Sequence, residues 1–567
     1  MATHYISAIP VSSMAKIFPE IDPADAPLSH LSCLVNEPLS FQVAYKLVSD
    51  QVFTVGTYVR IESELPISLY AVGYVPVLQT RDAALDDHYR PGLFGDILYP
   101  KALNPRIKEI RYPWESIYLE DDKTRLIART DSWQSIWLTV NEYGKRQKGG
   151  SYPVKLTFHS MKDNAVLAEC SLTVDVIGAA LPKQRLMYTN WFHCDCLCDM
   201  YGVEPFSDRF YEIFARYVEK AARNGMNTIL TPCFTPPLDT PIGDERMTVQ
   251  LVDVTVTGGE YSFDFTELAR FMDVAMKNGI HYFEHSHFFT QWGAAHAPKV
   301  IATVDGEQKR IFGWETEAAG KEYVGFLRAY IPELLAFLKS EGLDKTTLFH
   351  ISDEPEAKVL EKYRMAADSI RDLLSDCIVG DALSDYKYYE MGLTKTPIVR
   401  SDKAMDFVGK CDDLWVYYTG GECFDGLSNR LIQLPRERNR AMGYMLYYHD
   451  AKGFLHWGYN FYYGHLSLGL YNPAVDPCCS WANAGTSYSV YPGIDRKPMQ
   501  SIHQKIFADG LVDMRALALL ESLSSKEAAK ALIDKHLGSP NFFNTPESPE
   551  RFIGFRRALN EEIKKYL

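Results

Sequence analysis

Asp353 and Glu354 are neighbouring carboxylic acids that follow a short apolar run beginning at Phe349. Two adjacent carboxyl groups in a low-dielectric cleft cannot both ionise freely, so the pKa of one rises and that group can serve as a general acid. The next residue, Pro355, favours an extended backbone at Glu354 and closes a strand. Asp353 is also a suitable N-cap for a helix with Pro355 at its first position. The two interpretations are compatible, because a catalytic pair can stand where a strand gives way to a helix.

His285 and His287 stand two residues apart in another predicted strand. Alternate residues of a strand face the same side, so both imidazoles could bind one metal ion. Such a site needs further ligands, for which Glu284, His193 and Asp381 are candidates. A metal-dependent barrel hydrolase is therefore an alternative to histidines that bind a sugar or fill the core. We expect no metal and no cofactor, because no second spaced cluster of ligands follows.

Cys194, Cys196 and Cys198 also alternate, but no second Cys or His pair follows at the spacing of a zinc site. We predict a loop with free thiols there. The chain has 11 cysteines, an odd number scattered over 567 residues, which indicates reduced thiols rather than a disulfide framework. The first residues lack the basic and apolar regions of a signal peptide. A cytoplasmic location is the expectation.

The net charge is −14, from 73 acidic and 59 basic residues. This sign disfavours nucleic acid or an anionic membrane as partner, because both are bound through clustered Lys and Arg. No stretch approaches the roughly 18 apolar residues of a membrane span, so membrane insertion is not expected. A neutral ligand fits better, and the 13% aromatic content suits a sugar, whose apolar face packs on aromatic rings. The sequence leaves the oligomeric state open.

The N-terminal part has the pattern of an all-β domain. Residues 154–159 and 171–176 alternate apolar and polar side chains, which is the period of a strand with one buried face. Turn formers such as Gly149 and Gly150 separate these runs, and no long amphipathic helix interrupts them. We predict a β-sandwich over residues 1–180, ending in a linker at 178–182.

From residue 181 to residue 500, short apolar strands alternate with helical segments, which indicates parallel β/α units. Eight such units match the size of a (β/α)8 TIM barrel. The predicted strands are residues 186–193, 227–234, 281–289, 347–352, 377–383, 396–400, 414–418 and 454–459. The helical segments between them include residues 208–224, 321–338 and 356–374.

Two further segments complete the predicted architecture. Residues 247–265 alternate around Gly258 and Gly259 and are predicted as an inserted hairpin. Residues 501–567 are mostly helical in pattern, with a break at Gly538 to Pro540. The chain is therefore expected to hold a sandwich (1–180), a catalytic barrel (181–500) and a helical C-terminal appendix (501–567).

In a TIM barrel the reactive groups lie at the carboxyl ends of the strands. The acid pair ends the fourth predicted strand, and aromatic or imidazole side chains end several others. Taken singly, each ring is better explained as core, but as a set we expect them to line a substrate pocket. These candidates are Trp191, His193, His287, Tyr417, Tyr418, Trp457 and Tyr459.

The ordered combination of these features resembles glycoside hydrolase family 123, and the resemblance covers nearly the whole chain. One part is the Asp353-Glu354-Pro355 motif that closes the fourth strand behind an N-terminal β-sandwich. The other is the run Tyr491-Pro492-Gly493, followed by a helix that bears Asp509-Gly510-Leu511-Val512-Asp513. The acid pair alone is a short motif, and the combination is much more specific.

The resemblance implies an exo-acting β-N-acetylgalactosaminidase that releases terminal β-linked N-acetylgalactosamine (GalNAc) from an oligosaccharide or a glycolipid glycan. It also implies substrate-assisted catalysis, in which the 2-acetamido oxygen of the substrate attacks the anomeric carbon and forms an oxazoline. By the same resemblance, Glu354 is the general acid and then the base, and Asp353 orients the acetamido group. A carbohydrate-binding protein without activity is the remaining alternative, and the intact acid pair argues against it.

Overall fold

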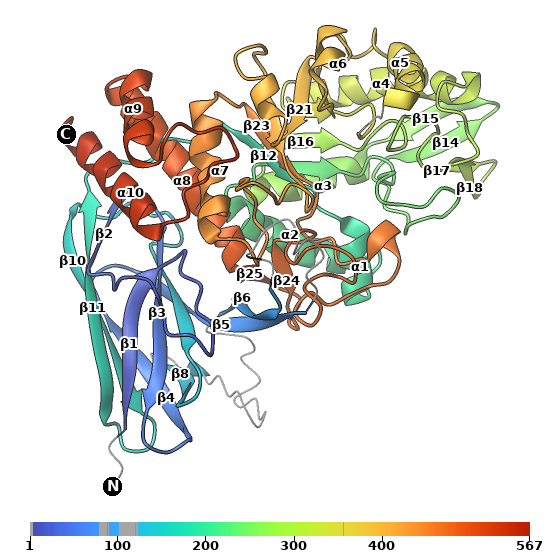
Figure 1. Ribbon diagram of the computed structural model, residues 1–567. Coiled ribbons are helices and arrows are strands. Elements are labelled where there is room, and N and C mark those ends of the chain that lie inside the picture. Colours follow the sequence, from blue (N-terminus) through green and yellow to red (C-terminus); the bar gives the residue numbers. More distant parts are fainter. Residues whose placement is uncertain (1–3, 79–87, 89, 101–118, 121–122, 355–356) are drawn as a thin grey trace.

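The computed structural model of the protein describes residues 4–78, 88, 90–100, 119–120, 123–354 and 357–567. Figure 1 shows a sheet-rich N-terminal region, coloured blue to teal, beside a larger region that holds the barrel. Three helices near the C-terminus, coloured red, lie at the junction of the two. The sequence predicted this order of sheet region, barrel and C-terminal helices.

Two sheets pack face to face in the N-terminal region. The first has the strand order β1 (Tyr5–Ser12), β3 (Leu39–Val48), β9 (Gln134–Val140), β5 (Ile67–Val77), β6 (Gly92–Pro100), β25 (Pro498–Ser501) and β24 (Val490–Pro492). The second has the order β2 (His30–Leu34), β11 (Val166–Ile177), β10 (Gly150–Ser160), β4 (Thr54–Glu62), β8 (Lys123–Arg129) and β7 (Leu119–Glu120). Buried side chains from both sheets, such as Phe41, Leu138, Leu156 and Val174, form one apolar cluster. The alternating pattern of residues 171–176 reflects this one-sided burial, whereas in residues 154–159 the polar Thr157 and His159 are buried as well.

Two strands that follow the barrel in the chain complete the first N-terminal sheet. β25 pairs antiparallel with β6, with Gln500 opposite Leu98, and β24 pairs with β25. The carboxylate of Asp96 in β6 accepts hydrogen bonds from the Tyr491 hydroxyl (2.6 Å) and from the backbone N–H of His503 (3.1 Å). The backbone and this buried carboxylate therefore join the predicted sandwich to the segment predicted as the end of the barrel.

Eight parallel strands form a closed barrel, as the sequence predicted. In order around the barrel they are β12 (Met187–Asn190), β13 (Thr228–Thr231), β16 (Tyr282–His285), β19 (Thr347–Phe349), β20 (Ile378–Ala382), β21 (Thr396–Arg400), β22 (Trp415–Tyr417) and β23 (Gly453–His456). Seven of them lie within their predicted ranges and β23 begins one residue before its own, but most end earlier than predicted. The residues after each strand therefore belong to loops at the carboxyl end, where side chains no longer alternate strictly between two faces.

Helices connect the barrel strands and cover the outside of the barrel. They are α1 (Cys194–Tyr201), α2 (Asp208–Arg223), α3 (Thr266–Lys277), α4 (Lys321–Ser340), α5 (Leu360–Asp368), α6 (Tyr386–Glu390) and α7 (Arg436–Tyr448). The helix predicted at 356–374 is shorter, because a 3₁₀ turn, η1 (Ala357–Val359), precedes α5. Between β21 and β22 the described chain has only the 3₁₀ turn η2 (Ala404–Asp406). The cysteines at 194–198 lie in helix α1 rather than in the predicted loop, and their thiols are free and buried.

Two accessory parts surround the barrel. The predicted hairpin exists as β14 (Asp253–Thr257) and β15 (Glu260–Asp264), and it forms a four-stranded sheet with β17 (Val300–Val304) and β18 (Glu307–Phe312). The C-terminal helices are α8 (Ile502–Leu523), α9 (Lys526–His536) and α10 (Pro549–Lys564). Helix α10 contacts the sandwich, where Asn560 donates a hydrogen bond to the Ser32 hydroxyl (2.9 Å). Among the described residues, no helix has the length and apolar character needed to cross a membrane.

Candidate active site

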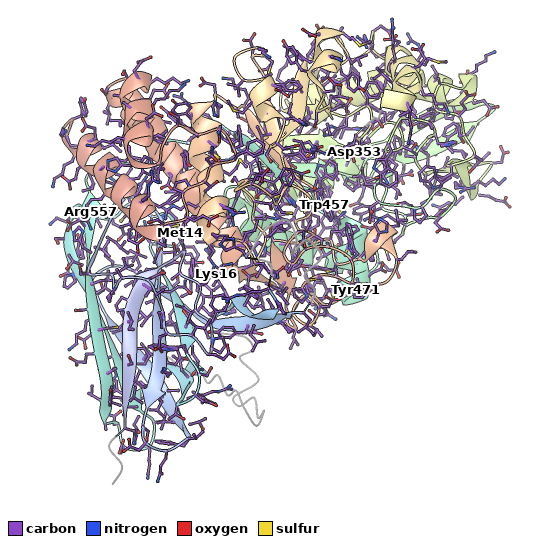
Figure 2. All side chains as sticks on the ribbon, viewed as in Figure 1. Met14, Lys16, Asp353, Trp457, Tyr471 and Arg557 are labelled. Atoms are coloured by element: carbon purple, nitrogen blue, oxygen red, sulfur yellow. The ribbon has the colours of Figure 1, made fainter. Side chains whose placement is uncertain are left out.

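A cavity of about 410 Å³ opens at the carboxyl ends of the barrel strands. Its walls come from the carboxyl ends of the barrel strands and from the loops that follow them, as expected for the reactive end of a TIM barrel. The predicted site residues that line it are Trp191, His193, His287, Asp353, Glu354, Tyr417 and Trp457. Figure 2 labels Asp353 and Trp457, both of which lie in the barrel region and away from the sandwich.

The acid pair projects from the loop after β19. Asp353 keeps an ordinary backbone, but Glu354 has φ of 42°, a left-handed conformation that is uncommon for a residue with a side chain. This turn lets both neighbouring carboxyl groups line the same cavity, which an extended strand would not permit. The neighbouring loop, after β16, holds this backbone in place, because its Trp292 N–H donates a hydrogen bond to the Asp353 carbonyl (2.7 Å). Pro355, the third residue of the motif, lies outside the described residues.

Burial raises the pKa of Asp353 well above its ordinary value, the charge of Glu354 raises it further, and the charge of His350 opposes the rise. Burial also raises the pKa of Glu354, against a hydrogen bond from Tyr417 that lowers it. The Tyr417 hydroxyl donates this bond to the Glu354 carboxylate. Two adjacent carboxyls with raised pKa values share protons as a pair, so their titration belongs to the pair rather than to either acid alone.

A buried charge network lies beneath the pair. Glu284, at the end of β16, accepts hydrogen bonds from Thr189 (2.6 Å), Trp191 (2.7 Å) and His350 (2.7 Å). The Nδ1 atom of His350 lies 3.7 Å from a carboxylate oxygen of Asp381. Burial alone would lower the pKa of His350, but these two carboxylates outweigh it and raise that pKa to about 10. His350 is therefore an imidazolium at neutral pH. The hydrogen bond from Trp191 to Glu284 also fixes the indole in the cavity wall.

His287 and His193 are neutral polar groups of the cavity. His287 stacks on His350, with ring centroids 4.5 Å apart, and burial followed by the His350 charge lowers the pKa of His287 well below its ordinary value. Burial, followed by the charge of Arg246, lowers the pKa of His193 to about 4. His193 Nε2 lies 2.8 Å from the Trp457 carbonyl, so the proton sits on Nε2 and Nδ1 faces Arg246 (3.4 Å).

Arg246 is itself held by a buried ion pair. Its Nε and a terminal nitrogen donate to the two oxygens of Asp195, at 2.7 and 2.9 Å. A third bond from its guanidinium reaches the Leu238 carbonyl (2.9 Å). Leu238 also lines the cavity, so the Arg246–Asp195 ion pair holds the loop after β13 against helix α1.

Aromatic rings form the opposite side of the cavity. Trp457, directly after β23, lies against Trp481 with centroids 5.9 Å apart and against Phe461 at 5.4 Å. All three line the cavity together with Trp191. An indole wall facing carboxyl groups is an arrangement that can pack the apolar face of a sugar while its hydroxyls meet polar groups.

Tyr418 and Tyr459 do not line the cavity, contrary to the prediction. Tyr418 is the residue after Tyr417 and faces the opposite side, where its ring packs on Phe454 and His456. Tyr459 lies beyond the end of β23, and its hydroxyl donates to the Tyr217 carbonyl in α2 (2.9 Å). Both rings are core residues between the barrel and its helices.

The proposed metal pair also separates. Strand β16 ends at His285, whose ring reaches the Tyr330 hydroxyl on α4 (3.0 Å), outside the barrel. His287 is in the following loop and turns into the cavity. Among the described residues no three metal-binding side chains are grouped. The two imidazoles therefore do not form the shared site that their spacing suggested.

Residues 191–520 match the family model of the glycoside hydrolase 123 catalytic domain. A family 123 glycoside hydrolase from Clostridium perfringens, whose structure was described for glycolipid glycan hydrolysis, has a TM-score of 0.74 at 11% identity, over 99% of this chain and 98% of that one. A β-glucuronidase from Bacteroides uniformis has a TM-score of 0.31 at 11% identity, over 87% of this chain and 48% of that one. No curated protein sequence matches.

A closed barrel with an acid pair at its carboxyl end is the architecture of a barrel glycoside hydrolase. The matched family model spans more than half of the chain, so the protein belongs to glycoside hydrolase family 123. The near-complete superposition on the Clostridium perfringens structure shows that the two share one fold from end to end.

Proposed function

We propose that the protein is an exo-acting β-N-acetylgalactosaminidase that releases terminal β-linked GalNAc by substrate-assisted, retaining hydrolysis. Membership of family 123 supports the acetamido-sugar substrate. The glycolipid glycans named for the Clostridium perfringens enzyme support a glycan or glycolipid as the natural substrate. The choice between GalNAc and its gluco epimer rests on the family.

The distribution of carboxyl groups in the cavity is the observation that carries the mechanism. The described carboxylates that line it are Asp353, Glu354 and Asp239. Both oxygens of Asp239 accept backbone hydrogen bonds, from Leu466 (3.3 Å) and Ser467 (3.0 Å). The acids that remain for chemistry are sequence neighbours, whereas a protein nucleophile would face the general acid across the sugar ring. A nucleophile supplied by the substrate fits this arrangement.

In the first step the acetamido carbonyl oxygen bonds to the anomeric carbon as the glycosidic C–O bond breaks. Glu354 transfers its proton to the leaving oxygen, which departs as an alcohol. Asp353 accepts a hydrogen bond from the acetamido N–H and stabilises the positive charge that develops on the oxazolinium. The charge of His350 favours the ionised form of Asp353 against burial and the charge of Glu354, which on balance raise the pKa of Asp353. The mechanism requires the proton of the pair on Glu354, from which the leaving oxygen takes it.

In the second step Glu354, now ionised, takes a proton from water. The water oxygen bonds to the anomeric carbon on the face that the leaving group left, and the oxazoline ring opens. The configuration is retained and the acid pair returns to its starting protonation state. Burial of the site raises the pKa of Glu354, which suits it to both roles.

Hydrolysis of aryl β-N-acetylgalactosaminide, its gluco epimer and the plain β-galactoside tests this proposal. We expect cleavage of the first, weaker or no cleavage of the second, and none of the plain galactoside, which lacks the nucleophile. Cleavage of the plain galactoside would overturn substrate assistance. If neither acetamido glycoside were cleaved, the assigned activity would be overturned. Loss of activity after a chelator is added would favour a metal-dependent hydrolase instead.

We also propose a cytoplasmic location, in line with the 11 cysteines, which form no disulfide among the described residues. Fractionation of cells with an antibody to the chain tests this. Recovery with membranes or outside the cell would contradict it.

A further inference from the structure

A second cavity, of about 500 Å³, lies at the end of the barrel opposite the acid pair. Its walls come from residues at the start of strands β13 and β16, from helix α8, and from Ser40 and Thr139 of the sandwich. Its volume is in the range of about 300–1,000 Å³ that is usual for small-molecule sites. The amino-terminal end of a TIM barrel does not carry the chemistry. A ligand bound here would therefore differ from the substrate.

The cavity has a basic surplus, in a chain whose net charge is −14. Its charged lining residues are the bases Lys183, Arg223, Lys505 and Arg515 and the acids Glu142 and Asp509. Lys505 Nζ lies 3.3 Å from Glu142, and Arg223 pairs with Glu219. Burial raises the pKa of Asp509 to about 7, so this carboxyl is only partly ionised at neutral pH. Among the described residues, the lining cations left without a paired carboxylate are Lys183 and Arg515.

Arg515 offers an unused pair of terminal nitrogens to the cavity. Its Nε donates to the Pro182 carbonyl (2.8 Å), and among the described residues its side chain has no other hydrogen bond or ion pair. Because Lys183 follows Pro182, this bond places the two free cations in neighbouring parts of the wall. Arg515 is half-buried, and its terminal nitrogens do not belong to the enclosed unpaired atoms of the described chain. Both nitrogens are therefore accessible to a ligand.

The environment of Arg515 leaves its charge uncompensated. Burial lowers the pKa of Arg515, and the charge that opposes this effect is that of Glu37, which already pairs with Arg556. Arg440 is the contrasting case: against burial, the charge of Asp513 raises its pKa, and Asp513 accepts two of its hydrogen bonds, at 2.7 and 3.0 Å. A partly desolvated guanidinium without such a partner gains from an oxyanion, which its planar fork binds through two parallel hydrogen bonds.

We propose that this cavity binds a phosphate-bearing small molecule, with Arg515 holding the phosphate group through both terminal nitrogens and Lys183 supplying a second positive charge. A phosphate monoester carries a charge of about −1.5 to −2 at pH 7, which matches two free cations. The volume leaves room for an organic group beside the phosphate, so a sugar phosphate fits better than free phosphate. The inference goes beyond the proposed function and does not rest on it, because the acid pair lies at the other end of the barrel.

Titration calorimetry of the full chain at constant ionic strength tests the site. The titrants are glucose 6-phosphate, inorganic phosphate and glucose. Arg515→Gln removes the guanidinium, and Lys183→Glu reverses the second charge at an exposed side chain. Arg185→Glu is the matched control, because Arg185 is exposed two residues further along and does not line the cavity. Melting temperatures without ligand check that each variant folds.

We expect glucose 6-phosphate to bind the wild type and glucose not to bind. Arg515→Gln should weaken binding at least about tenfold, since it removes hydrogen bonds between charged groups. Lys183→Glu should weaken it roughly tenfold through like-charge repulsion, and Arg185→Glu should leave it within about twofold. Glucose 6-phosphate should also raise the melting temperature of the wild type more than that of Arg515→Gln, because the ligand contacts the sandwich, the barrel and α8 together.

Three results would overturn the inference: neither phosphate compound binds the wild type, Lys183→Glu or a folded Arg515→Gln keeps the wild-type affinity, or Arg185→Glu loses as much as Lys183→Glu. The last result would mean that the phosphate responds to overall surface charge. Tighter binding of glucose 6-phosphate than of inorganic phosphate would assign the site to an organic phosphate, and equal binding would assign it to free phosphate.

Discussion

Removal of the Tyr417 hydroxyl tests how the acid pair is tuned. This hydroxyl donates a hydrogen bond to the Glu354 carboxylate, and the bond lowers the pKa of Glu354 against the effect of burial. A bond of this kind favours the ionised acid. In Tyr417→Phe the ionised form loses its donor, so the protonated form of Glu354 persists to higher pH.

The size of the effect follows from the energy of the bond. A hydrogen bond to a charged group contributes about 1.5–3 kcal/mol, and about 1.36 kcal/mol corresponds to one pH unit. Taking the lower figure, we expect the basic limb of the pH profile to move upward by about one pH unit. The sign is fixed by the role of Glu354, because activity is lost as pH rises and the general acid loses its proton.

The assay is kcat/KM against pH for an aryl β-N-acetylgalactosaminide, since this ratio reports on groups of the free enzyme. Tyr418→Phe is the matched control. It removes the same group from the next residue, whose ring faces the core and not the cavity. We expect its pH profile to follow that of the wild type.

A basic limb that stays in place in Tyr417→Phe, or moves to lower pH, would refute this reasoning. The first result would mean that Tyr417 does not bond the free acid, and the second that Glu354 does not need its proton. An equal shift in Tyr418→Phe would mean that the effect is not local to the cavity.

Three further predictions concern the charged groups. Glu354→Gln should lower kcat/KM by about 10²–10⁴ while GalNAc still binds by calorimetry, and an unchanged rate would remove Glu354 from the mechanism. His350→Gln should lose about 3–5 kcal/mol of unfolding free energy in urea, because two buried carboxylates lose their cation. The pKa of His350 is raised to about 10 in the folded protein, so the stability that its charge contributes is fully present below about pH 6.5 and is lost as pH rises through 10. The unfolding free energies of the wild type and of His350→Gln should therefore converge above about pH 10. Arg246→Met should cost about 3–5 kcal/mol in the same assay, and a cost below about 1 kcal/mol would show that its ion pair is exposed in solution.

The barrel and the acid pair were predictable because their signals are local. Each barrel strand lies in a short, mostly apolar run, and Asp353 and Glu354 directly follow the predicted strand at 347–352. The aromatic candidates were harder, because their direction depends on where a strand ends. Tyr417 and Tyr418 are the same residue type. Only the alternation of side chains along the strand places Tyr417 in the cavity and Tyr418 in the core.

Other site residues had weak signals or none. Glu284 and Asp381 lie inside predicted strands rather than at their ends, and their partner His350 is found only once three strands are side by side. The left-handed turn at Glu354 also has no signature, since glycine is the residue that usually indicates such a conformation.

The shared sheet of the two regions has a consequence for synthesis of the chain. Strand β6 is synthesised long before its neighbour β25, and the Asp96–His503 contact spans 407 residues. Until then β6 is an open edge with unpaired backbone groups, which can pair with other chains. A product that terminates after the barrel strands keeps that edge open and leaves the Asp96 carboxylate without its donors. Pairing of β6 therefore requires that the strands after the barrel have been made, and an edge that stays open is a surface on which chaperones and proteases can act.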